Sequence, residues 1–271
     1  MRRTAAVVLP PVVNLYERPD ETAPVVSQAI LGAPVAVLES RGAWALVETP
    51  DRYRGWARAR ALRPVARGRG RRPARGAAVE IGNLLANIYH EPDVTSASPI
   101  AVAPMLARLE IVEEAREWIR ARLPDGREGW LQKGDARPVT PEAARLDPQS
   151  VAATALMFLG LPYLWGGTSP FGLDCSGLAQ LAYRAHGFLL PRDADLQYAD
   201  RRLAIVRREA IGAGDLVFFG PAADSITHVG IALGSDAFVS ATTYRSPTVR
   251  IDRLDDPYWE GLYRGARRVR G

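Results

Sequence analysis

The sequence predicts an α+β domain that follows two small all-β barrels. An internal repeat fills the first half of the chain, and both copies consist of short strand-like segments separated by turn residues. From about residue 148 the pattern changes to two helical periods, a loop and three apolar runs with strand character. Helices followed by strands are typical of an α+β domain, and 271 residues are enough for all three parts.

The repeat defines the two barrels. Residues 14–65 align with residues 87–139 at an offset of 73, which becomes 74 in the second half of each copy. The matched pairs are Tyr16 and Tyr89, Pro19 and Pro92, Asp20 and Asp93, Trp44 and Trp118, Gly55 and Gly129, Trp56 and Trp130, Pro64 and Pro138, and Val65 and Val139. We expect a first barrel over residues 11–65 and a second over residues 79–140.

An arginine-rich segment separates the two barrels. It holds five arginines and no acidic residue, namely Arg67, Arg69, Arg71, Arg72 and Arg75. The formal net charge of the chain is +5, and subtracting these five charges leaves zero. The basic character therefore belongs to one short segment, which we expect to be a solvated linker over residues 66–78. Contact with an anionic polymer, a nucleic acid or lipid headgroups is the alternative.

Two helices are expected after the barrels. The first covers residues 148–160, because apolar side chains recur there at helical spacing. The second covers residues 176–186, with Asp174 as its N-cap and Gly187 as its C-terminal stop.

Cys175 is the only cysteine of the chain and lies in the first turn of the second helix. It cannot form an internal disulfide or a zinc site built from cysteines. The segment before it is rich in glycine and proline, and the positive end of a helix dipole favours thiolate over thiol. Cys175 is therefore a candidate nucleophile.

A cysteine nucleophile needs a base within hydrogen-bond reach and a group that orients this base. Of the three histidines, His90 lies inside the second repeat and is interpreted as a surface residue. His186 would lie about three turns along the helix from the thiol, where it complements the helix dipole. His228 opens a predicted strand and is the candidate base.

The strand pattern predicts a partner for His228. The strand-like segments are residues 215–219, 228–233 and 237–243. The last two are joined by a predicted Gly-Ser-Asp hairpin turn. If Leu233 pairs with Ala237, His228 lies opposite Thr242, and Ser240 shares the same sheet face. Either hydroxyl could then accept a hydrogen bond from the imidazole and fix its tautomer.

The chain closely resembles the NlpC-type cell-wall peptidases. The resemblance lies in the segments PYLWGG, GLDCSGLAQ, LPRDADLQ, GDLVFF and THVGIALG, and in the AFVSA that follows. NlpC-type peptidases are papain-like cysteine peptidases that cut the stem peptides of bacterial peptidoglycan. The resemblance covers residues 150–250, and the Gly–Trp pair in each repeat resembles bacterial SH3-like domains. It implies a papain-like domain over residues 148–271 after two SH3-like barrels, as in γ-D-glutamyl-L-diamino acid endopeptidases that process muropeptides with a free N-terminal L-Ala.

The resemblance also implies the roles of particular residues. Cys175 is the nucleophile, His228 the base and Tyr163 a group on the oxyanion side. Substrate contacts are expected from Trp165, Asp174 and Ser176.

One position departs from the family pattern. The family usually has a second histidine where this chain has Ser240. A serine carries no charge and orients an imidazole less strongly, so the third member of the triad is in question while the Cys–His dyad stands.

The resemblance implies one further site in the first barrel. In relatives with SH3-like units, the first unit closes one end of the cleft, and an acid and a tyrosine hold the N-terminal amine of the substrate. Glu17 and Tyr53 are the candidates here. Their repeat counterparts, His90 and Arg127, could not do the same, which indicates that the first unit is specialised.

The expected function is hydrolysis of the γ-D-Glu–diamino acid bond, with peptidoglycan-derived peptides as the partners. No metal or organic cofactor, nucleic acid, membrane or second subunit is expected. The first 20 residues do not resemble a secretory leader, so we expect a cytoplasmic protein, with secretion as the alternative. Two other functions stay open. One is another Cys–His amidase or acyltransferase, and the other is a cell-wall-binding protein with an impaired peptidase domain.

Overall fold

The computed structural model describes residues 3–65, 78–139 and 146–270. It divides into two compact units, residues 1–142 with both barrels and residues 143–271 with the α+β domain. The expected arginine-rich linker over residues 66–78 lies outside the described residues, apart from Ala78. Within the described ranges, no helix has the length and apolar character needed to cross a membrane.

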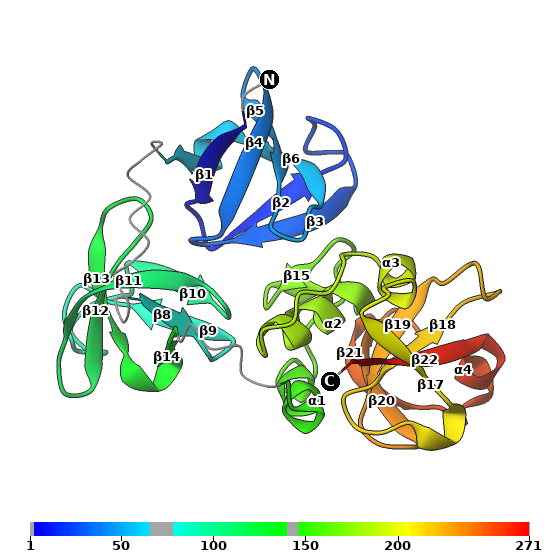
Figure 1. The fold of residues 1–271 in the computed structure, drawn as a ribbon. Coiled ribbons are helices and arrows are strands. Elements are labelled where there is room, and N and C mark those ends of the chain that lie inside the picture. Colours follow the sequence, from blue (N-terminus) through cyan, green and yellow to red (C-terminus); the bar gives the residue numbers. More distant parts are fainter. Residues whose placement is uncertain (1–2, 66–77, 140–145, 271) are drawn as a thin grey trace. The chain divides into compact units, whose positions relative to one another are not determined.

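The first barrel is a seven-stranded antiparallel sheet in the order β3-β2-β6-β5-β4-β1-β7 (Figure 1). Its elements are β1 (Thr4–Val8), β2 (Val12–Tyr16), β3 (Val25–Ile30), β4 (Pro34–Arg41), β5 (Trp44–Glu48), β6 (Arg54–Arg58), the 3-10 helix η1 (Ala59–Ala61) and β7 (Leu62–Pro64). The sheet begins before residue 11, because β1 pairs with both β4 and β7 and buries Val8 in the barrel core.

The second barrel repeats this plan in two smaller sheets, ordered β13-β12-β11-β8-β14 and β10-β9. Its elements are β8 (Ala78–Ile81), β9 (Leu85–Ile88), β10 (Ala101–Pro104), β11 (Arg108–Glu114), β12 (Trp118–Arg122), β13 (Glu128–Gln132), η2 (Lys133–Asp135) and β14 (Ala136–Pro138). Its core is built from alternating strand residues, among them Ile81, Ile88, Leu109 and Leu131.

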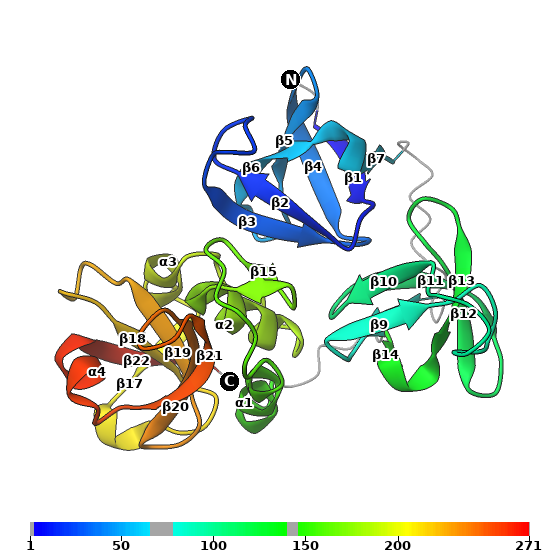
Figure 2. The same ribbon diagram turned by 180° about the vertical axis from the view of Figure 1, so that it is seen from behind.

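The α+β domain contains a six-stranded antiparallel sheet in the order β17-β22-β18-β19-β20-β21 (Figures 1 and 2). Its elements are α1 (Pro148–Leu156), β15 (Thr168–Ser169), β16 (Gly172–Leu173), α2 (Cys175–Arg184), α3 (Ala194–Tyr198), β17 (Leu203–Val206), η3 (Arg208–Ala210), β18 (Leu216–Phe219), β19 (His228–Ala232), β20 (Ala237–Thr242), β21 (Thr248–Arg253), α4 (Pro257–Leu262) and β22 (Tyr263–Val269). Helix α2 packs against α1, β19 and β20. The predicted α+β class is confirmed.

Both predicted helices are shorter than expected at their C-terminal ends. Helix α1 ends at Leu156 rather than at residue 160, where Gly160 has a φ of +82° and its N–H donates to the Val249 carbonyl. Helix α2 ends at Arg184, after which the N–H groups of His186 and Gly187 each donate to a carbonyl three residues earlier. These i+3 bonds tighten the last turn, as is common at helix ends.

The predicted register of the β19–β20 hairpin is confirmed. Ile231 pairs with Val239, Ala232 pairs with Phe238, and the Leu233 N–H donates to the Ala237 carbonyl. Continuing this antiparallel register places Ser240 on the face of the sheet that His228 occupies.

Candidate active site

Cys175 is the first residue of α2, and local hydrogen bonds fix the helix start. The Asp174 carboxylate accepts a bond from the Gly177 N–H at 2.7 Å, as expected for an N-cap. Only glycine fits at position 177, because a Cβ there would lie 2.0 Å from the Gly167 carbonyl oxygen. The glycine-rich hairpin of β15 and β16 therefore lies directly against the first turn of the helix.

The thiol of Cys175 is largely enclosed, with part of its surface open to solvent. Burial raises the pKa of Cys175 to about 12, and the negative charge of Asp174 adds to this increase. Backbone N–H groups of Val229 and Ser176 lower the pKa, but their effect is smaller. Burial thus acts against the expected effect of the helix N-terminus and favours the neutral thiol.

His228 is held at the start of β19. Its Nε2 lies 3.0 Å from the Oγ of Ser240, which is fully buried on β20. The other candidate hydroxyl, Thr242 Oγ1, accepts a bond from the Tyr244 N–H instead. Burial lowers the pKa of His228 to about 3, so the imidazole is neutral at physiological pH.

Helix α2, which begins with Cys175, packs on β19, which begins with His228. The Val229 N–H interacts with the Cys175 sulfur, which places the thiol beside the residue that follows His228. Nε2 of His228 is engaged by the Ser240 hydroxyl, and Nδ1 has the lone pair that a base needs only when Nε2 carries the proton and donates it to Ser240. A neutral thiol beside a neutral imidazole can react by proton transfer during nucleophilic attack.

Tyr163 lies within electrostatic range of the nucleophile. Burial raises the pKa of its phenol above the ordinary value, and interactions with Cys175 and Asp174 raise it further. The phenol therefore stays protonated and can donate a hydrogen bond to a developing oxyanion. Trp165, two residues further on, is 68% exposed and is free to contact a substrate.

Asp174 and Ser176 are engaged by a buried arginine. Arg192 donates from Nη1 to Asp174 Oδ1 at 3.0 Å and to Ser176 Oγ at 2.9 Å, and from Nη2 to Asp174 Oδ2 at 2.5 Å. Both oxygens of Asp174 also accept backbone or hydroxyl hydrogens. Much of the hydrogen-bonding capacity of these side chains is used inside the protein, and their contact with substrate stays a prediction.

Sequence reasoning did not assign roles to three buried residues around this centre. Arg192 lies just before α3 and Gln197 lies on α3, both within the segment LPRDADLQ. Gln197 donates to the Ser176 and Pro191 carbonyls at 3.0 and 2.9 Å. Trp259 stacks on His228 from α4. The sequence signal for Arg192 was its positive charge in the segment that follows α2, the helix capped by Asp174. A buried arginine needs a carboxylate partner, and Asp174 is that partner.

The remaining histidines lie in other surroundings. His186 Nε2 is 2.9 Å from Thr154 Oγ1 of α1, so this ring joins the two helices just beyond the end of α2. His90 is exposed on the second barrel, as interpreted from the sequence. Among the residues that the structure describes, no group of three or more His, Cys, Asp or Glu side chains could hold a metal ion.

The expected amine-binding pair lies at one end of a strand pair in the first barrel. Tyr16 pairs with Trp56 in antiparallel register, so Glu17 after β2 and Tyr53 before β6 lie at the same end. Glu17 is exposed and Tyr53 is partly buried. The chain thus brings a carboxylate and a phenol to one edge of the barrel.

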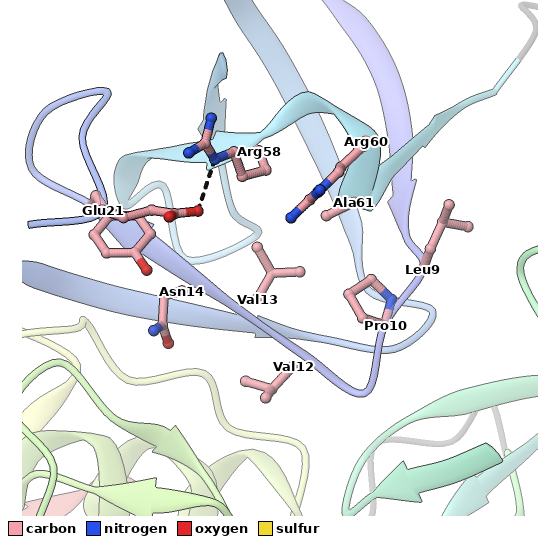
Figure 3. A pocket seen from close by; sticks show the side chains of 10 residues that line it. Leu9, Pro10, Val12, Val13, Asn14, Glu21, Arg58, Arg60 and Ala61 are labelled. Carbon is pink, nitrogen blue, oxygen red and sulfur yellow. Dashed lines mark hydrogen bonds and ion pairs between the residues drawn. The ribbon is translucent and has the colours of Figure 1, made fainter. Parts of the chain in front are cut away.

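A groove of about 600 Å³ occupies another part of the first barrel (Figure 3). Its lining includes Val12, Val13, Asn14, Tyr16, Glu21 and Arg58. Glu21 and Arg58 form an ion pair at 2.8 Å, and the Arg58 guanidinium lies 4.2 Å from the centre of the Trp44 ring. Neither Glu17 nor Tyr53 lines this groove, although Tyr16, which precedes Glu17, does.

Comparison with known proteins agrees with this architecture. A model of the NlpC/P60 family matches residues 160–268, and a model of the bacterial dipeptidyl-peptidase SH3 domain matches residues 15–62. A γ-D-glutamyl-L-lysine dipeptidyl-peptidase of Bacillus cereus is 31% identical, over 89% of this chain and 74% of the relative. Dipeptidyl-peptidase 6 of Lysinibacillus sphaericus is 29% identical, over 96% and 94%. The crystal structure of an NlpC/P60 family protein from Bacillus cereus superimposes with a TM-score of 0.87 at 25% identity, covering 98% of this chain and 99% of that one.

Proposed function

The chain belongs to the NlpC/P60 family, and on this basis we propose that it is a cysteine endopeptidase with a defined bond specificity. The bond is the amide between γ-D-Glu and the diamino acid in peptidoglycan stem peptides with a free N-terminal L-Ala. The observation that carries the proposal is the Cys175 thiol at the start of α2, which the Val229 N–H contacts, together with His228 as the preceding residue of β19, held by Ser240. Two curated relatives that the chain covers over most of their length are named dipeptidyl-peptidases, which supports this bond.

The first half of the reaction forms an acyl-enzyme. Nδ1 of His228 takes the proton of Cys175 as the sulfur attacks the amide carbonyl carbon. The oxyanion is stabilised by the backbone N–H of Cys175 and by the Tyr163 hydroxyl. The tetrahedral intermediate then collapses, the C–N bond breaks, and His228 returns its proton to the leaving amine. A thioester between Cys175 and the γ-carboxyl of D-Glu remains.

The second half regenerates the thiol. His228, neutral again, takes a proton from a water molecule that attacks the thioester carbonyl. The C–S bond breaks, the proton passes back to the Cys175 sulfur, and L-Ala-D-Glu leaves with a free γ-carboxylate. The high pKa of Cys175 means that the thiolate is not formed in advance, so proton transfer accompanies attack.

Recognition of the amine end sets the length of peptide that is accepted. The Glu17 carboxylate pairs with the ammonium group of L-Ala, and the Tyr53 hydroxyl contributes a hydrogen bond. Peptides whose L-Ala is still attached to the sugar lack this ammonium group and are poor substrates. The enzyme would therefore act on released peptides, in turnover or recycling of cell-wall material.

The test uses L-Ala-γ-D-Glu-diamino acid tripeptides, with diaminopimelate or lysine at the third position, and product analysis by mass spectrometry. We expect L-Ala-D-Glu and the free diamino acid, and no cleavage with Cys175→Ala or His228→Ala. Cleavage at a different bond, or intact tripeptide with a folded wild-type protein, would contradict the proposal. In the second case, a cell-wall-binding protein with an impaired peptidase domain becomes the better explanation.

A further inference from the structure

The hydroxyl of Ser240 does not by itself fix the orientation of His228. A hydroxyl can either donate to Nε2 or accept from it, and only the accepting arrangement leaves Nδ1 as a base. A carboxylate would remove this ambiguity, because it only accepts, and would also offset the positive charge that forms on the ring. Another neighbour of His228 must supply orientation and charge stabilisation if the dyad is to work.

Trp259 is placed to do this. Its indole stacks on the imidazole of His228 with ring centres 4.9 Å apart and an angle of 27° between the planes. Trp259 lies on α4 and is only 2% exposed. Phe219 approaches the same imidazole more obliquely, at 5.8 Å and 48°. The indole is therefore the aromatic surface most nearly parallel to the imidazole plane.

The indole is itself held in place from several sides. The rings of Phe219, Phe238 and Tyr258 lie 4.9, 5.3 and 4.9 Å from it, the last two nearly perpendicular to it. The helix that carries Trp259 is capped by Asp256, whose carboxylate accepts from the Tyr258 N–H at 3.0 Å. A ring fixed in this way can restrain its neighbour rather than follow it.

We propose that Trp259 is the positioning residue that takes over part of the task of the missing second histidine. The stacked indole restricts rotation of the His228 ring, so that Nε2 stays at Ser240 and Nδ1 stays directed to the thiol. When Nδ1 takes the proton of Cys175, the negative face of the indole stabilises the imidazolium that forms. The inference rests on the proposed Cys175–His228 dyad, but it concerns how that dyad is held.

The test compares Trp259→Leu and Trp259→Phe with a matched core variant. Phe218→Leu is the control, because Phe218 on β18 is as buried as Trp259 and its ring contacts the Tyr198 ring instead of His228 or Trp259. Thermal unfolding and circular dichroism establish that each full-length variant folds. Two rates are then measured, namely alkylation of Cys175 by iodoacetamide at pH 7.5 and tripeptide cleavage. Cys175 is the only cysteine, so alkylation reports on one site.

Trp259→Leu should lower both the alkylation rate and kcat by about tenfold or more, with KM within about twofold of wild type. Trp259→Phe keeps an aromatic face and should recover part of this loss, and Phe218→Leu should change neither rate by more than about twofold. A folded Trp259→Leu protein that matches the wild type overturns the proposal, as does an equal loss in Phe218→Leu. If Trp259→Leu does not fold, Trp259→Phe decides, and alkylation at the wild-type rate overturns the proposal.

Alkylation separates this proposal from the proposed function. If the wild-type protein alkylates at a measurable rate but cleaves no tripeptide, the substrate assignment fails while the role of Trp259 is still measured. If tripeptide is cleaved and Trp259→Leu is indistinguishable from wild type, the substrate assignment stands and the positioning role fails.

Discussion

The two barrels share an aromatic ring pair and a strand register, and they differ in the side chains at one edge. Tyr16 and Trp44 form a perpendicular ring pair at 5.7 Å, and Tyr89 and Trp118 form its counterpart at 6.0 Å. The strand register agrees as well, because Trp44 faces Arg58 in the first barrel and Trp118 faces Gln132 in the second. The same aromatic geometry and strand register are therefore present in both copies.

The exposed ends are different. The first barrel carries Glu17 and Tyr53 at one edge, where the second carries His90 and Arg127. Arg127 of the second barrel is committed to the Asp125 carboxylate at 2.7 Å and to a backbone carbonyl. A repeated scaffold can therefore specialise by exchanging surface charge, because those side chains contribute little to the core that defines the fold.

The largest expected effect tests the edge of the first barrel. Glu17→Gln removes the charge that would pair with the substrate amine, and Glu17→Ala removes the side chain. A charge-assisted hydrogen bond contributes about 1.5–3 kcal/mol, so kcat/KM for the free-amine tripeptide should fall by about 10- to 100-fold. Steady-state kinetics on the tripeptide provide the measurement.

The repeat supplies the control for this prediction. His90→Gln changes the matched position of the second barrel and should leave kcat/KM unaltered. On an N-acetylated tripeptide, the Glu17 variants and the wild type should be equally slow, since no ammonium group is present to recognise. Unchanged cleavage of the free-amine tripeptide by Glu17→Ala would show that the first barrel is not specialised in this way.

The next effect tests whether the two barrels are packed equally tightly around their matched glycines, Gly55 and Gly129. A Cβ at Gly55 would lie 2.7 Å from Leu15 Cβ, and one at Gly129 would lie 2.6 Å from Ile88 Cγ2. Overpacking of this kind costs about 1–3 kcal/mol, so Gly55→Ala and Gly129→Ala should reduce the free energy of unfolding by similar amounts. Urea denaturation measures both. Gly134→Ala is the control, because a Cβ added there would meet no atom within 4 Å and little change is expected.

A smaller effect tests a shared turn. The Thr22 and Thr95 N–H groups donate to Asp20 and Asp93, and these bonds lower the pKa of both carboxyls below 3.8. A lowered folded-state pKa contributes stability that is present above pH 3.8 and is lost as the pH falls through the folded-state value. Asp20→Asn and Asp93→Asn should each flatten the fall in melting temperature below pH 4, and by the same amount. A change in melting temperature for only one of the two variants would show that the two turns are not equivalent.

The smallest effect separates the edge of the first barrel from its groove. Arg58→Gln gives the first barrel the residue found at the matched position of the second, and it breaks the ion pair with Glu21. Because the groove is lined by neither Glu17 nor Tyr53, peptide cleavage should stay within about twofold of wild type. A loss of cleavage activity as large as that of Glu17→Gln would indicate that the groove, rather than the edge, is the specialised region.

Local patterns were sufficient to predict much of the site. The period of two along β19 and β20, together with a short turn, predicted that Ser240 and Thr242 would share a face with His228. The choice between them required the fold, because Thr242 is engaged by the backbone of Tyr244 after the strand ends. Asp174 as N-cap was also predictable, since the cap bond depends on residues within one turn.

Other features depend on contacts between distant segments. Trp259 reaches His228 from α4, and nothing in the spacing of the sequence connects the two. The buried pairing of Arg192 with Asp174 likewise joins a loop to a helix start. The burial that raises the pKa of Cys175 also depends on segments distant in the sequence, because β19 packs against α2 and supplies the Val229 N–H.

The neutral state of the Cys175 thiol has a consequence for chemical durability. Thiolates are the species that attack peroxides and disulfides, and burial, which raises the pKa of Cys175 to about 12, disfavours the thiolate at physiological pH. With no second cysteine in the chain to resolve a sulfenic acid, slow oxidation is the main protection available to this residue. We expect the protein to keep its nucleophile intact under peroxide exposure that inactivates enzymes with a preformed thiolate.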